Sequence, residues 1–119
     1  MTRDDKVRDK LLMLVNGGEL DKSNMTKALD IYEWLKTEYP DAHISSMMIS
    51  HIALTFQRVL KGEQISDSDV EYKMPLSQDE IMARNAIIKR IRLSVRKDIS
   101  DAEINYLDIH IRNFIYDNL

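Results

Sequence analysis

The chain has 119 residues, about the size of one domain, and we expect a single globular unit over residues 1–119. Its composition, 44% apolar and 31% charged, contains neither a membrane-length apolar run nor a signal-peptide core, so we expect a cytoplasmic protein without a membrane partner. The absence of cysteine excludes disulfides and thiolate zinc sites, and a net charge of −3 excludes a general attraction to nucleic acid.

The first three helices are predicted from apolar residues that recur with a period of 3.6. One helix ends at the Asn-Gly-Gly of residues 16–18, as glycine after a helix favours. A second begins around residues 23–24 and ends before Pro40. A third runs from about 44 to 60, with Gly62 as its stop.

Two further helices are predicted from capping boxes. In this motif a serine and a glutamate three residues later each satisfy a free backbone N–H at a helix start. The sequence holds two such pairs, each before an apolar helical pattern: Ser77 with Glu80 before residues 78–97, and Ser100 with Glu103 before residues 101–116. No segment alternates as a strand would. The sequence therefore predicts an all-α fold, a bundle of five helices, with residues 63–75 left unassigned.

Two histidines lie at the edge of the apolar side of their helices. At about 100° per residue, His51 is roughly 80° and His110 roughly 90° from the centre of its apolar stripe. A ring at such a border can stay neutral, take a proton near its ordinary pKa of about 6.5, or be reached by another protein. It can equally be a packing residue with a wet polar tip, and the pattern leaves both interpretations open.

Charged residues lie in line with both histidines. Arg58 follows His51 by seven residues, while Glu103 and Asp117 lie seven residues before and after His110. Such groups can steady a charged or phosphorylated imidazole through charge-assisted hydrogen bonds. Ordinary surface charge is the alternative interpretation for each of them.

Two stretches around these histidines resemble a known family. The stretch ISHIALTFQRVLKGEQI (49–65) resembles the first histidine motif of the phosphotransferase-system regulation domain, with His-Ile, a hydrophobic turn, an arginine and a Gly-Glu helix end. The stretch ISDAEINYLDIHI (99–111) is similar to the second motif, in which an acidic pair and an apolar run lead into His-Ile. The histidines are 59 positions apart, which is compatible with one domain of that family.

The resemblance implies regulation rather than catalysis, so we expect no enzyme activity and no cofactor. Domains of this family are helical bundles, usually paired in bacterial antiterminators and transcription activators, and they dimerise. Their histidines take phosphoryl groups from the phosphocarrier protein or a sugar-permease component, and phosphorylation changes how the dimer packs. His51 and His110 become phosphoacceptor candidates, with Arg58 as a supporting residue carried over from the family and Glu103 as a second one suggested by its position.

The sequence departs from the family pattern in three respects. Ser50 stands where an acidic residue often precedes the first histidine, and Asn105 stands where the second motif tends to have glycine. There is one copy of the domain, without room for an RNA-binding or DNA-binding module, so we expect a stand-alone version that acts on transcription through a partner. The alternative is a helical dimerisation or protein-interaction domain that is not phosphorylated.

The segment 81–97 is strongly basic and lacks acidic residues. Its six cations are spread around the predicted helix, which favours a solvated surface over a landing strip for nucleic acid or an acidic partner: Arg84, Lys89, Arg90, Arg92, Arg96 and Lys97. Arg84 falls on the apolar stripe, so we expect it to pair with a carboxylate inside the bundle or across a dimer seam.

Two apolar residues, Met47 and Leu54, lie outside the main stripe of the third helix beside His51. They suggest a second buried contact, which a homodimer or a groove between helices would provide. The three histidines, His43 included, have no metal-ligand spacing, and there is no phosphate loop or serine elbow. We therefore expect no metal site.

Overall fold

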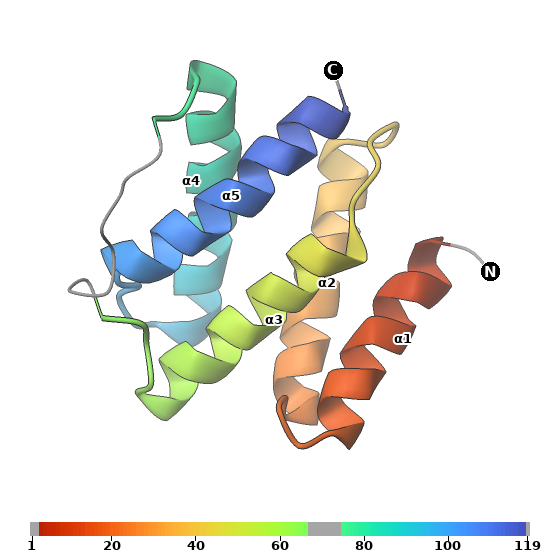
Figure 1. Ribbon diagram of the computed structural model, residues 1–119, viewed down its shortest axis with the longest axis vertical. Coiled ribbons are helices and arrows are strands. Elements are labelled where there is room, and N and C mark those ends of the chain that lie inside the picture. The colour runs from red at the N-terminus through yellow and green to blue at the C-terminus, as the bar shows by residue number, and fades with distance from the viewer. Residues whose placement is uncertain (1–2, 67–74, 119) are drawn as a thin grey trace.

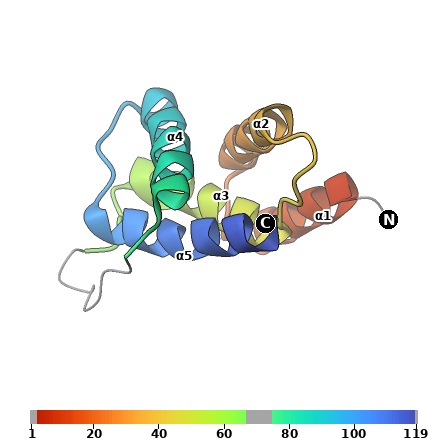
Figure 2. The same ribbon diagram turned by 90° about the horizontal axis from the view of Figure 1, so that it is seen from above.

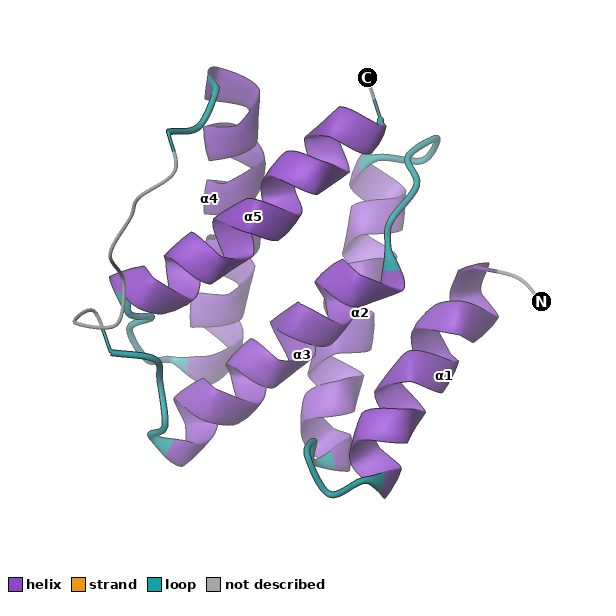
Figure 3. Ribbon diagram, in the orientation of Figure 1, coloured by secondary structure: helices purple, strands orange, loops and turns teal. Residues whose placement is uncertain are grey.

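The computed structural model describes residues 3–66 and 75–118, and the chain there forms five α-helices (Figure 1). They are α1 (Arg3–Asn16), α2 (Lys22–Glu38), α3 (Ser46–Lys61), α4 (Gln78–Val95) and α5 (Asp101–Asp117). Within those residues there is no strand (Figure 3), so the prediction of an all-α five-helix bundle is confirmed. Most of the unassigned segment 63–75 lies outside the described residues.

The helices form two layers. Helices α1, α3 and α5 lie side by side in one layer, and α2 and α4 both cover the same face of it (Figure 2). Helix α3 is central because it contacts each of the other four. Its inward side chains, among them Ile49, Ile52 and Phe56, are completely buried. The opposite face of the α1, α3 and α5 layer is left uncovered by any described helix, and we call it the open face.

The ends of α3 follow local rules of the sequence. The Ser45 hydroxyl accepts a hydrogen bond from the Met48 N–H at 3.1 Å, and Gly62 ends the helix at a left-handed φ of 71°. The sequence predicted that this helix begins near residue 44, two residues too early. Ile44 is buried like the apolar residues of the helix, but it lies in the segment before it. Helix α4 ends at Val95 rather than at residue 97, because Arg96 adopts a left-handed φ of 55°.

Only one of the two predicted capping boxes is complete. Ser77 and Glu80 bond each other's backbone N–H reciprocally, at 2.7 and 3.2 Å. The Ser100 hydroxyl accepts from the Glu103 N–H at 3.2 Å, but the Glu103 carboxylate does not return to the Ser100 N–H. That N–H bonds Gln64 Oε1 at 2.7 Å instead. The second half of this box was predicted wrongly, because Glu103 has a stronger partner on another helix.

Ion pairs join α4 to α5. Arg84 Nη1 lies 3.5 Å from Asp108 Oδ2, which confirms that the arginine on the apolar stripe has a carboxylate partner inside the bundle. Burial raises the pKa of Asp108. Arg112 Nε lies 3.0 Å from Glu80 Oε2, and this bond holds the pKa of Glu80 at about 2.

No described helix has both the length and the apolar composition that crossing a bilayer requires.

A buried amide ties α3 to the start of α2. Gln57 Oε1 accepts from the Asn24 Nδ2 at 2.6 Å and from the Asp21 N–H at 2.9 Å. The Asp21 side chain makes no capping bond, so the start of α2 relies on this contact. Both Gln57 and Asn24 are buried.

Replacing Gln57 by leucine should therefore destabilise the protein by about 1–3 kcal/mol, because a buried and a part-buried donor lose their acceptor. Urea unfolding followed by circular dichroism measures this loss. The control variant Thr37→Val removes only an exposed hydroxyl bond and should change stability by less than about 0.5 kcal/mol. Equal effects of the two substitutions would contradict the assignment.

Candidate functional site

The two candidate histidines meet at the seam between α3 and α5. Their ring centroids are 4.5 Å apart and the ring planes are inclined by 34°. The Tyr106 ring also stacks with His51, with its centroid 6.3 Å from that of the imidazole. Both histidines are half-buried, which agrees with their predicted position between core and solvent. Residues 59 positions apart in the sequence thus form one site.

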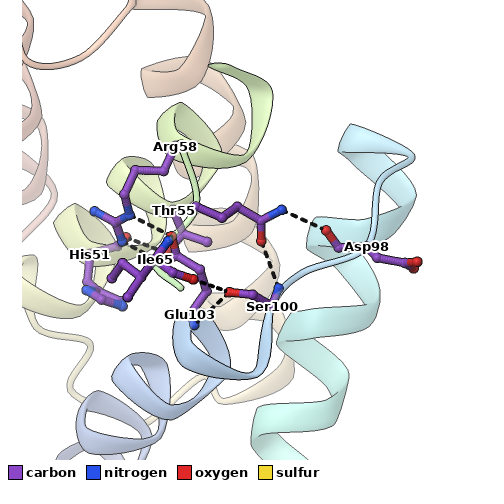
Figure 4. A network of polar contacts seen from close by, with 8 residues as sticks. His51, Thr55, Arg58, Ile65, Asp98, Ser100 and Glu103 are labelled. Atoms are coloured by element: carbon purple, nitrogen blue, oxygen red, sulfur yellow. Dashed lines mark hydrogen bonds and ion pairs between the residues drawn. The ribbon is translucent and has the colours of Figure 1, made fainter. Parts of the chain in front are cut away.

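An ion pair between the same two helices fixes the alignment that brings the histidines together. Arg58 binds Glu103 through two parallel bonds of 2.7 Å each, from Nε to Oε2 and from Nη2 to Oε1 (Figure 4). Helices α3 and α5 run antiparallel (Figure 1). Arg58 follows His51 by seven residues and Glu103 precedes His110 by seven, so the two pairs belong to the same antiparallel register. They are separated along the seam by roughly 10 Å, or two helical turns.

The carboxylate of Glu103 is the centre of a wider network. Its side chain is completely buried, whereas that of Arg58 remains 25% exposed. Glu103 Oε2 also accepts from the Ile65 N–H at 3.1 Å, and the Ser100 hydroxyl donates to the Ile65 carbonyl at 2.9 Å. These contacts fasten the segment after α3 to the start of α5 (Figure 4).

The predicted supporting residues therefore bond to each other rather than to the rings. No hydrogen bond joins Arg58 or Glu103 to either imidazole among the described residues, and Asp117 is exposed at the end of α5. Arg58 still acts on His51 through space, because its positive charge disfavours a second one on the ring. Tyr106 was missed from the sequence, although it lies one turn before His110 on the same side of α5.

Both imidazoles are held in the neutral form. Burial, the neighbouring His110 and the Arg58 charge, in that order, lower the pKa of His51 from 6.5 to about 3. Burial alone lowers the pKa of His110. His51 Nε2 is buried and bonds no described residue, whereas neither ring nitrogen of His110 is both buried and unbonded. Neutral imidazoles keep a lone pair on one ring nitrogen, so they are nucleophiles at neutral pH.

Apolar side chains on the open face lie next to the site. Met47 precedes His51 by one turn and is 66% exposed. Tyr106 and Ile109 lie beside His110 on α5 and are 45% and 50% exposed. Leu54, which was predicted to share a second contact with Met47, is half-buried. The histidine seam thus opens onto a surface that carries large exposed apolar groups.

The third histidine is separate from this site. The backbone of His43 is clamped by Asn118, which accepts from the His43 N–H at 2.7 Å and donates to its carbonyl at 3.0 Å. The clamp joins the turn before α3 to the end of α5. Across the described ranges, no group of histidine and carboxylate side chains is arranged to hold a metal ion.

Comparison with known proteins identifies one family. The family model of the PRD domain matches residues 27–114, which include both histidines and the Arg58–Glu103 pair. The match begins within α2 and ends within α5. No curated protein and no solved structure matches the chain.

Mild acid should destabilise this protein through His51. The unfolded ring takes up a proton near pH 6.5 and the folded ring does not until about pH 3, so the unfolded state binds more protons and stability falls as the pH drops below 6.5. The melting temperature of the wild type should fall more steeply than that of His51→Gln between about pH 7 and pH 5. Parallel curves for the wild type and His51→Gln would contradict the burial of His51.

Proposed function

Because the chain belongs to the PRD-domain family, a family of phosphotransferase-system regulation domains, we propose that it is a histidine phosphoacceptor module that acts on transcription through a partner. The observation that carries this proposal is the contact of two neutral imidazoles, His51 and His110, on the seam between α3 and α5. Across the described residues, no group of side chains is arranged to hold a metal ion. The proposed phosphoryl transfer uses only the ring nitrogens and the helices that carry them.

The proposed chemistry is phosphoryl transfer to a ring nitrogen. The nitrogen that carries the lone pair attacks phosphorus, and the new N–P bond forms as the bond from phosphorus to the donor breaks. The low pKa values of the two rings keep this lone pair free of a proton at neutral pH. The proposed donor is the phosphocarrier protein or a sugar-permease component.

The contact between the rings gives the modification a structural consequence. A phosphoryl group adds up to about two negative charges, which cannot enter a contact of 4.5 Å between ring centroids without moving α3 relative to α5. The same charges favour a proton on the second ring and oppose a second phosphoryl group beside the first. Phosphorylation of one histidine is therefore proposed to open the seam.

The proposed partner on the open face is a second copy of this chain. Met47, Tyr106 and Ile109 supply exposed apolar area around the histidines, so a change at the seam alters the surface that the second copy contacts. In this way a local charge becomes a change in how a homodimer packs, and the dimer transmits it to the transcriptional partner.

The two histidines should differ in reactivity. His51 Nε2 is buried and bonds no described residue, and the His51 ring contacts the rings of both Tyr106 and His110. No ring nitrogen of His110 is buried without a hydrogen-bond partner in this way. We therefore expect His110 to be modified first and His51 to react only after the seam has opened.

Incubation with phosphoenolpyruvate and the purified phosphotransferase proteins, followed by intact mass, tests the proposal. The wild type and His43→Gln should gain an acid-labile phosphoryl group, because His43 lies outside the site. His51→Gln should still be labelled, whereas labelling of His110→Gln should be at least about tenfold slower, which corresponds to about 1.4 kcal/mol in barrier. No adduct, under conditions that label another domain of this family, would contradict the proposal.

That negative result would favour the second candidate function, a dimerisation or interaction domain without phosphorylation. The buried His51 Nε2 and the stacked Tyr106 ring favour it, because they give His51 a packing role.

The dimer can be tested separately by sedimentation velocity. Ile109→Glu places a charge on the open face beside His110 and should shift the protein from dimer to monomer. Leu93→Glu is the matched control, because Leu93 is a comparably exposed residue on α4, in the other layer. A wild type that is monomeric at high concentration, or a dimer lost only with Leu93→Glu, would overturn this assignment.

A further inference from the structure

Helix α4 carries a basic surface on the side that faces away from the other layer. Arg84 is engaged by Asp108, and the Arg90 guanidinium lies 4.3 Å from the centroid of the Trp34 ring on α2. The remaining cations of the helix and its C-terminal turn are exposed, and none of them forms an ion pair with a described residue: Lys89, Arg92, Arg96 and Lys97. These four exposed charges lie within nine residues, on the last turns of α4 and just after its end.

The positive charge of this segment contrasts with the negative charge of the rest of the chain. Residues 81–97 carry six positive charges and no negative one, so a net charge of −3 leaves −9 for the remainder. A concentrated positive potential on an otherwise acidic protein attracts an acidic ligand to that surface.

The same surface has an apolar centre. Leu93 is 68% exposed among the cations. Two hollows of about 390 and 350 Å³ flank it, and Lys89 and Leu93 line both. The first also contains Ile88 and Arg92, and the second lies against Trp34. We call Lys89, Arg92 and Leu93, which share one side of α4, together with Arg96 just after its end, the α4 face.

We propose that the α4 face docks an acidic amphipathic helix of a partner protein. Its carboxylates would meet Lys89, Arg92 and Arg96, and its apolar side chains would enter the two hollows beside Leu93. A protein fits better than a nucleic acid, since the exposed leucine and the hollows offer nothing to a phosphate backbone. The nearby Trp34 ring already has the Arg90 guanidinium over one face, which is then not available for base stacking.

This docking surface is independent of the histidine seam. Helix α4 belongs to the layer that covers one face of α3 and α5 (Figure 2), whereas the histidines lie on α3 and α5 themselves. The protein can therefore hold a second copy on one side and an acidic partner on the other. Failure of phosphorylation would leave this inference untouched, because the two surfaces share no residue.

A designed acidic helix provides the probe. A peptide of roughly 18 residues, about five turns, with leucines on one face and glutamates elsewhere, is titrated into the ¹⁵N-labelled full chain at about 0.15 M salt. The expected result is a Kd below about 1 mM, with amide shifts centred on residues 85–96. The same peptide with lysine in place of glutamate should not bind. Duplex and single-stranded DNA of similar length should bind more weakly than the acidic peptide.

Matched variants locate the binding. K89E/R92E should weaken the acidic peptide at least about tenfold, and Leu93→Ser should weaken it by a smaller factor. K6E/K10E makes the same charge change at exposed positions of α1 and should leave the Kd unchanged, as should His51→Gln. The proposal is overturned by shifts centred on α3 and α5, by equal weakening in K6E/K10E, or by tighter binding of DNA.

Discussion

The ion pair between Arg58 and Glu103 is the constraint on which the rest of the site depends. A carboxylate that is completely buried would be costly without a partner, and removing one member of such a pair typically costs about 3–5 kcal/mol. Glu103 compensates its burial with two bonds to Arg58 and a third from the Ile65 N–H. A slip of α3 against α5 by one turn would break all three. The pair therefore admits one register of the two helices.

This register also brings the two histidines into contact, two helical turns from the ion pair. With Arg58 opposite Glu103, His51 lies opposite His110, and each ring removes the other from water. The burial that this produces keeps both imidazoles neutral. The seam thus holds the ion pair at one end and the contact between the two rings at the other. In the proposed function, a phosphoryl charge at the histidines acts while the ion pair at the far end of the seam stays in place, so the proposed movement is a splaying of the helices at the histidine end.

Local rules in the sequence predicted the helices well, because apolar periodicity, the Ser77 box and Gly62 act within a few residues. They also placed His51 and His110 at the border of the core and required a partner for Arg84. What they could not give depends on other helices. The same Ser-x-x-Glu pattern occurs twice. The Glu80 carboxylate completes the capping box of its own helix, whereas the Glu103 carboxylate bonds Arg58 on α3, and only the presence of Arg58 distinguishes the two cases.

The most direct test is an NMR comparison of the wild type with Glu103→Gln, which keeps the volume of the side chain and removes its charge. In the wild type, contacts between the ring protons of His51 and His110 should be observed, and His51 should stay neutral at about pH 5. In the folded variant these contacts should weaken and the pKa of His51 should rise toward 6.5. Unchanged ring contacts and an unchanged His51 pKa in the folded variant would contradict the claim that this pair holds the histidines together.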